Sequence, residues 1–241
     1  MKLVIIRHGD PDYVHDSLTD KGKIEAKLLS ERMKNMEVTE FYQSPLGRAQ
    51  LTASYTLNEV GRSAETLDWL KEFEPRISRP DRLFRKTVAW DWLPQDWTKD
   101  SRFYDYDHWY EPEAMQNANV KERYQWVCDN FDAFLAEHGY EHTDNYFKVT
   151  NSNHDTIVFF CHFGLECVLL SHLLHISPMP LWHGFVAAPT SVTIVHTEER
   201  KKGIASFRVA QFGDISHLYV GNEEPSFAAR FAECFGDSTQ H

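Results

Sequence analysis

Apolar residues are arranged in two patterns along this chain of 241 residues. Continuous apolar runs at 3–6 and 156–161 end abruptly in polar residues and glycine, which predicts two short, fully buried strands. At 19–35 and 120–139 the apolar residues instead recur every three to five positions, which predicts helices that bury one face. Buried strands that alternate with one-sided helices are typical of layered α/β domains with a largely parallel sheet.

Capping and breaking residues set the predicted ends of the helices. Thr19 is a suitable N-cap for the first helix. Pro45 fits the first turn of a second helix, where its missing N–H costs nothing, and Gly61 is expected to stop that helix. Gly139 ends the helix that begins near residue 120. The buried face of the first helix is expected to carry Ile24, Leu28, Met33 and Met36.

Three further strands and one helix complete the predicted layers. We expect strands at 40–43, 191–197 and 205–212, with the charged stretch 198–202 as the turn between the last two. A helix that packs on the sheet follows the run at 156–161. Its apolar positions are Leu165, Val168, Leu169, Leu173 and Ile176.

The stretch 72–150 interrupts this alternation. Its first half is rich in acids and aromatic residues without a clear period, and contains Trp90, Trp92, Trp97 and Trp109. We expect an insertion that lies over the α/β layers as a cap. The sequence therefore predicts one domain over 1–241: a three-layer α/β sandwich with a mostly parallel central sheet, helices on both faces and an aromatic-rich cap. The tail after residue 221 is expected to be loosely packed.

Charge and composition narrow the class of protein. A formal net charge of −11 argues against nucleic-acid binding, because phosphate backbones select basic surfaces. A small anionic substrate remains compatible with it, since a local pocket can be positive on an acidic protein. No apolar run approaches the roughly 18 residues of a spanning helix, and the run at 3–6 is too short for a signal peptide. The four cysteines lack CxxC spacing, so we expect reduced thiols and a cytoplasmic protein without membrane contact.

Two histidines stand at equivalent places in the pattern. His8 follows the first buried strand and His162 follows the second, with Gly9 and Gly164 close behind them. Ligands of open α/β sheets bind outside the carboxyl ends of the strands, so we expect the two imidazoles to meet in one crevice. The glycines allow the backbone to turn sharply and to approach a ligand.

Two arginines add permanent positive charge to this crevice. Arg7 precedes His8, and Arg48 lies at the start of a predicted helix, near N–H groups that favour anions. Taken singly, each residue has an ordinary structural explanation. Arg7 and His8 would be the polar end of a strand, Arg48 a solvated helix residue and His162 a histidine of the core. Together, two guanidiniums and two imidazoles suit a tetrahedral dianion, because the planar guanidinium makes paired hydrogen bonds to phosphate.

Four motifs occur in a specific order: RHG at 7–9, LTDKGKIEA at 18–26, SPLGRAQLTA at 44–53 and CHFG at 161–164. On these motifs the chain resembles the histidine phosphatase superfamily, in its phosphoglycerate-mutase-like branch. RHG alone is common, whereas the ordered set is specific. The resemblance covers both ends of the α/β layer and leaves out the aromatic insertion.

The resemblance implies a phosphatase that needs no cofactor and no metal. His8 would attack phosphorus and form a phosphohistidine, for which it must be neutral; the neighbouring arginines favour this by lowering its pKa. Arg7, Arg48 and His162 would hold the non-bridging oxygens of a small phosphorylated metabolite. The implied substrate-binding set is Arg7, Gly9, Asp10, Arg48 and His162.

A carboxyl group must deliver a proton to the leaving oxygen. The family usually places it in a Leu-x-Glu just after the third strand. Leu70 and Glu72 match this pattern, so Glu72 is the preferred donor. Glu74 would point the same way if the strand continued, and Asp91 or Glu113 in the insertion are further alternatives.

The chain also departs from the family pattern. It has Pro11 where threonine is frequent and Val14 where asparagine is frequent. Pro11 removes a hydroxyl and a backbone donor near the expected phosphate, and Val14 removes a polar contact. Both changes are expected to affect which substrate the protein binds, and neither removes a residue of the expected catalytic set.

Two other functions would use the same residues. A phosphoglycerate mutase needs extra basic groups for the substrate carboxylate, which the arginines recurring every three residues from Arg76 to Arg85 would supply; otherwise they form a solvated face. A binding module would hold phosphorylated ligands without turnover.

His172 and His175 are spaced for metal ligation, but no third ligand is obvious, so no metal is expected. No motif indicates the particular substrate or the oligomeric state.

Overall fold

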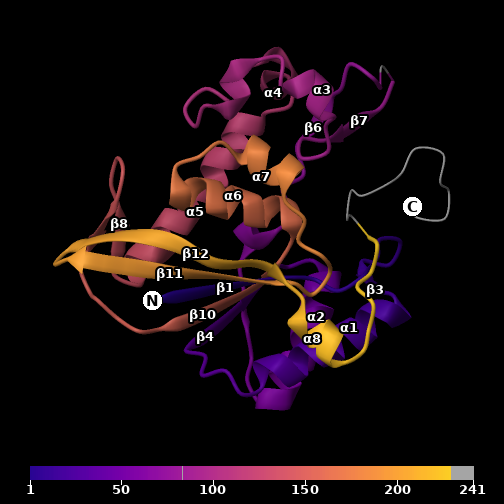
Figure 1. The fold of residues 1–241 in the computed structure, drawn as a ribbon, viewed down its shortest axis with the longest axis vertical. Coiled ribbons are helices and arrows are strands. Elements are labelled where there is room, and N and C mark those ends of the chain that lie inside the picture. Colours follow the sequence, from indigo (N-terminus) through magenta and orange to yellow (C-terminus); the bar gives the residue numbers. More distant parts are fainter. Residues whose placement is uncertain (83, 229–241) are drawn as a thin grey trace.

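A central sheet of eight strands organises the fold (Figure 1). The computed structural model describes residues 1–82 and 84–228. The strand order is β5-β4-β10-β1-β11-β12-β9-β8. Their bounds are β1 Lys2–Arg7, β4 Glu40–Gln43, β5 Glu65–Thr66, β8 Tyr140–His142, β9 Phe147–Val149, β10 Thr156–Cys161, β11 Val192–Lys201 and β12 Ile204–Asp214.

The sheet has a parallel half and an antiparallel half. All pairings from β5 through β4 and β10 to β1 are parallel. From β1 onward, β11, β12, β9 and β8 pair antiparallel, because β11 returns directly into β12 and β8 into β9. The α/β prediction is confirmed, and the parallel half is the one whose strands end at the predicted histidines.

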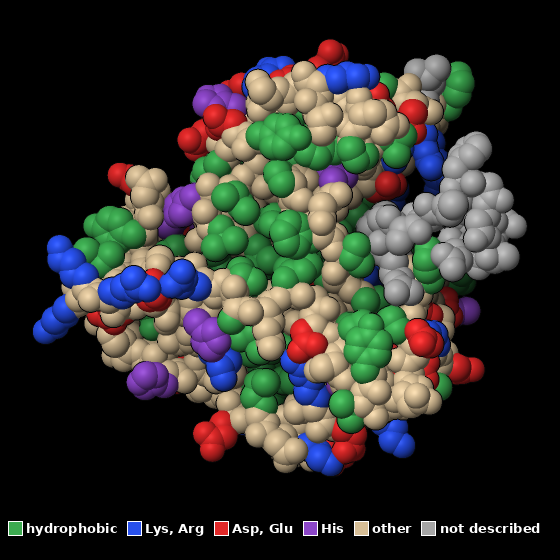
Figure 2. Space-filling model, viewed as in Figure 1, with side chains coloured by type: hydrophobic (Ala, Val, Ile, Leu, Met, Phe, Trp, Pro, Cys, Tyr) green, Lys and Arg blue, Asp and Glu red, His purple; other side chains and the backbone are tan. Residues whose placement is uncertain are grey.

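Helices cover both faces of the sheet (Figure 1). One layer holds α1 Asp20–Met33, α2 Gly47–Val60 and α8 Ser216–Val220, and the other holds α5 Val120–Glu137, α6 Phe163–Leu174 and α7 Pro178–Gly184. Successive residues of β1 enter opposite cores: Leu3 and Ile5 pack with α5 and α6, whereas Val4 and Ile6 pack with α1 and α2. A strand covered on both faces has no polar side, which explains its continuous apolar run. Figure 2 shows apolar side chains gathered between α6–α7 and the β11–β12 ribbon.

Most predicted ends are close to the observed ones. The Thr19 hydroxyl accepts the N–H of Gly22 and so caps α1. Gly61 ends α2 in the left-handed conformation, with φ of 63°. Two details differ: α2 begins at Gly47 rather than at Pro45, and β11 includes most of the charged stretch that was expected to be a turn.

The predicted buried face of α1 was partly wrong. Ile24 is 50% exposed, while Glu25 is fully buried beside Ala26 and Leu29. The carboxylate of Glu25 accepts the backbone N–H of Asp10 and that of Ser226. These hydrogen bonds rotate the helix so that a charged position, rather than the neighbouring isoleucine, faces inward.

Residues 72–150 divide into two kinds of structure. The first part forms the hairpin β6 Arg76–Ser78 with β7 Lys86–Val88, followed by the short helices α3 Pro94–Trp97, η2 Ser101–Tyr104 and α4 Glu113–Gln116. Figure 1 shows these elements beyond α7, on the side away from the sheet. The second part, α5 with β8 and β9, belongs to the main layers. Trp92, Trp97 and Trp109 are buried in the main core.

The helices and cysteines of the described residues agree with the predicted lack of a membrane span and with the predicted reduced thiols. Within 1–82 and 84–228, no helix is long and apolar enough to cross a membrane. Cys128, Cys161 and Cys167 are buried free thiols, and Cys234 lies outside the described residues. Burial raises the pKa of all three thiols, so they are protonated at neutral pH.

Candidate active site

Parallel pairing of β1 with β10 brings the two strand-end histidines together. Arg7 stands opposite Cys161 in the register, so His8 and His162 leave the sheet side by side. The Cys161 carbonyl accepts the N–H of His8 at 3.0 Å. The two imidazole centroids lie 5.1 Å apart, with 57° between the rings. The two histidines expected to share a site at the carboxyl edge of the sheet therefore lie side by side, and both are buried.

The imidazole of His8 is held in one tautomer. It is only 2% exposed, and its Nδ1 lies 2.7 Å from the Gly9 carbonyl oxygen. A carbonyl oxygen only accepts, so Nδ1 carries the hydrogen and Nε2 carries the lone pair. Burial, and then the charges of Arg7 and Arg48, lower the pKa of His8 well below its usual value. His8 is therefore neutral at physiological pH and presents a nucleophilic Nε2.

Arg7 places a buried guanidinium close enough to His8 for its charge to lower the pKa of the imidazole. Its side chain is 2% exposed, and Nη1 donates to the Ala187 carbonyl at 2.6 Å. Nε is buried and has no hydrogen-bond partner among the described residues. An arginine remains charged at neutral pH, so Arg7 keeps donors that can serve an anion in the crevice.

Arg48 is fixed by an aspartate that the sequence did not point to. Its Nη1 lies 2.6 Å from Oδ1 of Asp16, and its guanidinium lies over the Tyr13 ring at 5.5 Å. Asp16 also accepts the N–H of Gly47 at 2.7 Å. A Cβ at Gly47 would lie 2.3 Å from the Asp16 carbonyl oxygen, so only glycine fits this contact. Asp16 thus orients Arg48 at the start of α2.

Two hydroxyls of the SPLGRAQLTA motif complete the floor. Ser44 Oγ lies 2.8 Å from Nε2 of His162, which is fully buried. Thr52 Oγ1 accepts the N–H of Gly9 at 2.9 Å and donates to the Arg48 carbonyl. Burial, followed by the neighbouring charges, lowers the pKa of His162 well below its usual value. Both hydroxyls lie in a motif the sequence singled out, but only the arginine in it was assigned a role.

Glu72 reaches the same crevice from the segment after β5. Its Oε1 accepts the N–H of Phe73 at 2.8 Å and that of Leu165, in the first turn of α6, at 2.9 Å. Burial raises its pKa, although these hydrogen bonds and the charges of Arg48 and Arg7 oppose the shift. A carboxyl group that holds its proton more tightly than usual suits proton donation.

The other carboxyl candidates lie in different surroundings. β5 ends at Thr66 and a 3-10 turn follows, so the strand alternation that would have aligned Glu74 with Glu72 is absent, and Glu74 is exposed. Asp91 is paired with Arg79 at 3.2 Å, and Glu113 is an exposed residue of α4. Glu72 is the candidate whose carboxyl group lies at Gly164 and Leu165, two and three residues after His162.

Asp10, predicted to contact substrate, makes its hydrogen bonds within the protein. One carboxylate oxygen accepts the Thr19 hydroxyl at 2.6 Å, and the other accepts the Ser226 hydroxyl. Its backbone N–H donates to Glu25 at 2.9 Å. These contacts use Asp10 to anchor the loop after His8, and they also hold the segment after residue 221, which was expected to be loosely packed.

Glu25, which anchors the same loop, makes stability pH-dependent. Burial raises its pKa from 4.5 to about 7. Between these values the folded state binds more protons than the unfolded state, so this group favours folding most below pH 4.5 and loses that contribution as pH rises through 7. A shift of this size corresponds to roughly 3 kcal/mol. Glu25→Gln should remove the part of the pH dependence of the unfolding free energy that Glu25 contributes.

Urea unfolding at several pH values between 5 and 8 measures this effect. The free energy of unfolding of Glu25→Gln should fall less with rising pH than that of the wild type. Buried Glu166, whose pKa is also raised to about 7, supplies a slope of similar size that Glu25→Gln leaves in place. Glu31→Gln, on the exposed face of α1, is the matched control and should keep the wild-type slope. Parallel curves for wild type and Glu25→Gln would contradict the assignment.

A cavity of about 600 Å³ adjoins the crevice. A Cβ at Gly164 would lie 2.5 Å from Trp90 Nε1 and 2.7 Å from Glu72 Oε1, so the indole and the carboxyl group meet above this glycine. On the other side, Val186 lines the cavity and directly precedes the Ala187 carbonyl that Arg7 binds. The cavity therefore touches the site at two points. Its lining includes Arg79, Arg82, Trp90, Trp182, His183 and Val186.

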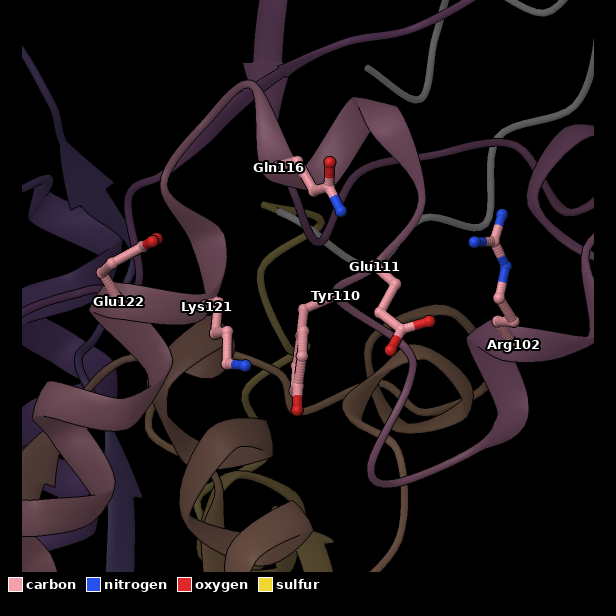
Figure 3. Close-up of a pocket in the computed structure, with 6 residues that line it drawn as sticks. All are labelled: Arg102, Tyr110, Glu111, Gln116, Lys121 and Glu122. Carbon is pink, nitrogen blue, oxygen red and sulfur yellow. The ribbon is translucent and has the colours of Figure 1, made fainter.

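A second hollow of about 540 Å³ lies elsewhere (Figure 3). Figure 3 shows Lys121 beside the Tyr110 ring, with Glu111 and Arg102 further along the wall. None of the predicted site residues lines it. Its lining combines two cationic and two acidic side chains, so their charges offset one another and favour no dianion.

The structure is that of an α/β protein whose parallel half-sheet brings two histidines together at its carboxyl edge, close enough to two arginines for their charges to lower the pKa of His8. Residues 3–209 match the family model of the histidine phosphatase superfamily, branch 1, and the chain belongs to this family.

Relatives and solved structures agree with this assignment. The chain is 23% identical to phosphoserine phosphatase 1 of Hydrogenobacter thermophilus, over 87% of this chain and 92% of that protein. The structure resembles a phosphoserine phosphatase of Entamoeba histolytica (17% identity, TM-score 0.58, 90% and 98% of the two chains). It also resembles a mycobacterial glucosyl-3-phosphoglycerate phosphatase (16% identity, TM-score 0.58, 88% and 98%). The protein is a phosphoric monoester hydrolase.

Proposed function

We propose that this phosphatase hydrolyses a small phosphorylated metabolite through a phosphohistidine on His8, without a metal ion. The observation that carries the proposal is the state of His8: buried, neutral, and held by the Gly9 carbonyl with its lone pair on Nε2. The fixed charges of Arg7 and Arg48 beside it supply the positive field that metal ions supply in many other phosphatases.

In the first step His8 Nε2 attacks phosphorus and the bond from phosphorus to the ester oxygen breaks. Arg7, Arg48 and His162 bind the three non-bridging oxygens, and the charge on them is stabilised in the transition state. Glu72 gives its proton to the leaving oxygen, which departs as a neutral alcohol. The product on the enzyme is a phosphohistidine, and Glu72 is left as a carboxylate.

In the second step water attacks the phosphohistidine. The Glu72 carboxylate takes a proton from this water while the nitrogen–phosphorus bond breaks. Inorganic phosphate leaves, and both His8 and Glu72 return to their starting protonation states. One carboxyl group thus serves as acid and then as base.

The substrate's alcohol portion would occupy the cavity between Trp90 and Val186, so the hairpin β6–β7 and the segment after it would cap the site. Arg79 is nearly buried and already paired with Asp81 and Asp91. Arg82 lines the same cavity and is exposed. Arg82 is therefore the cation we assign to a second anionic group on the substrate.

Arg82→Ala should raise KM about tenfold for a phosphomonoester that carries a carboxylate, since a charge-assisted hydrogen bond contributes about 1.5 kcal/mol. KM for p-nitrophenyl phosphate, which lacks that group, should not change. Arg76→Ala is the control, because Arg76 is equally exposed but does not line the cavity. Equal effects of Arg82→Ala on both substrates would exclude this role.

A hydrolysis screen over sugar phosphates, nucleotides and phosphoglycerates, run in EDTA, tests the proposed function. We expect release of inorganic phosphate at rates that EDTA does not reduce. Isomerisation of 3-phosphoglycerate without phosphate release would identify a mutase instead. Tight vanadate binding with no turnover across the panel would identify a binding module.

A further inference from the structure

Three histidines gather around one aspartate at the far end of α6. Asp132 comes from α5, His142 ends β8, His172 lies in the last turn of α6, and His175 is the C-cap of that helix. His172 follows the catalytic-site residue His162 by ten positions, so the helix rise separates them by about 15 Å. The cluster is therefore distinct from the phosphate crevice. Figure 1 shows β8 at the edge of the sheet, beside α5.

The donor atoms of this cluster converge on one point. His172 Nε2 lies 2.7 Å from one oxygen of Asp132, and His142 Nδ1 lies 3.1 Å from the other. One ligand atom from each of the three residues falls within 4.8 Å of the other two. Zinc binds histidine nitrogen and carboxylate oxygen at about 2.0–2.2 Å, so ligand atoms on one ion lie roughly 3.4 Å apart. Small side-chain movements bring all three onto a single ion.

The surroundings favour the tautomer that ligation needs. If Nε2 of His172 binds a metal, its hydrogen must be on Nδ1, and Nδ1 lies 3.3 Å from the hydroxyl of Tyr106, which can accept it. His172 is 5% exposed and His142 is 21% exposed, and the ring of His142 stacks on Phe147 at 4.9 Å. The ligands are thus held in place and are still reachable from solvent.

Two further nitrogens in the cluster are buried without a protein partner. Nε2 of His142 and Nε2 of His175 make no hydrogen bond with any described residue. The two rings lie 5.1 Å apart, and the Tyr106 ring lies 5.5 Å from His175. Buried polar atoms normally find a partner. Of the two, Nε2 of His175 is thus available to a further ligand, because no described residue occupies it.

We infer that Asp132, His142 and His172 form a binding site for a divalent transition metal ion of the Zn²⁺ type, apart from the catalytic crevice. Two imidazoles and one carboxylate are a common protein ligand set for such ions, and His175 offers a further nitrogen nearby. The ion would join α5, α6 and the β8–β9 hairpin, three elements that the chain connects only through loops. Its role would be structural, so catalysis would not depend on it.

Calorimetry with Zn²⁺ on the EDTA-stripped full-length protein tests the inference. We expect one equivalent to bind and the Tm to rise, and Co²⁺ in its place should give the visible absorption of a low-coordinate nitrogen and oxygen site. His142→Ala should lose that equivalent and the rise in Tm while hydrolysis of p-nitrophenyl phosphate stays unchanged. His108→Ala should keep both, because His108 pairs with Asp105 at 2.9 Å on the surface without a third ligand.

NMR of the unmodified protein adds a measurement that does not depend on a variant folding. Zn²⁺ should shift the imidazole signals of His142 and His172 and leave those of His8 and His162 unchanged. If Zn²⁺ instead perturbs the catalytic pair alone, or if His142→Ala keeps the full stoichiometry, the proposed site does not exist. Failure of the wild type to bind any Zn²⁺ leads to the same conclusion.

Discussion

His8→Ala is expected to lower kcat for p-nitrophenyl phosphate by about 10,000-fold or more, the scale seen when a covalent nucleophile is removed. The reason is chemical rather than structural. Without Nε2 no nitrogen–phosphorus bond forms, and water has to attack the ester directly. Among the described residues the imidazole has a single hydrogen-bond partner, the adjacent Gly9 carbonyl, so its loss should leave the surrounding layers intact.

The intermediate itself gives the sharper measurement. Wild-type protein quenched during turnover of a ³²P-labelled ester should carry acid-labile, alkali-stable label, as expected for a phosphoramidate, and His8→Ala should carry none. His196→Ala removes an exposed histidine from β11 and should retain both label and activity. Label on His8→Ala, or wild-type activity in that variant, would remove the phosphohistidine from the mechanism.

His8, His162 and Arg7 could be predicted because their position follows from strand direction alone, whereas Arg48 and Glu72 were predicted from motifs. β1 and β10 are parallel neighbours, so anything that follows them must emerge at the same edge. This holds for His8 and His162 without knowledge of any side-chain conformation. Arg7, as the last residue of β1, shares the argument. Periodicity and strand ends therefore predicted the floor of the crevice.

Residues whose role depends on loop conformation could not be predicted in this way. Asp16 binds Arg48 only because its own backbone adopts a left-handed φ of 45° against Gly47. Ser44 and Thr52 are ordinary hydroxyls until the folded loop brings them to His162 and Gly9. No spacing rule encodes such contacts.

A prediction of the buried face from hydrophobicity fails where a charged residue is buried. The apolar count on α1 selected Ile24, yet the neighbouring Glu25 lies inside, because its carboxylate accepts two backbone N–H groups. The residues around Asp132 could not be predicted as a group either, because they come from three different elements. His172 lacked a visible third ligand in the sequence, since Asp132 and His142 lie 40 and 30 positions away and meet it only through the packing of α5 and β8.

Glu72→Gln should separate leaving-group protonation from nucleophilic attack. For an alkyl phosphate, whose alkoxide is a poor leaving group, kcat should fall about 100- to 10,000-fold, the usual contribution of a general acid. For p-nitrophenyl phosphate the first step, measured as the burst of p-nitrophenolate, should be nearly unaffected, because p-nitrophenolate leaves without a proton. Its steady-state kcat should still fall, because hydrolysis of the phosphohistidine has lost its base. Glutamine keeps the length and the carbonyl oxygen that accepts the N–H groups of Phe73 and Leu165, so the crevice should stay in place.

The pH profile identifies the acid independently of the substrate comparison. Burial raises the pKa of Glu72, so the wild type should stay active on alkyl phosphates to higher pH than an ordinary carboxylic acid allows, then lose activity as Glu72 ionises. Glu72→Gln has no such group, so this alkaline decline should vanish and leave a low, flat rate. Glu74→Gln, an exposed neighbour, should keep the wild-type profile. If Glu74→Gln rather than Glu72→Gln abolishes the decline, the proton comes from Glu74, and the buried carboxyl group serves only to hold the start of α6.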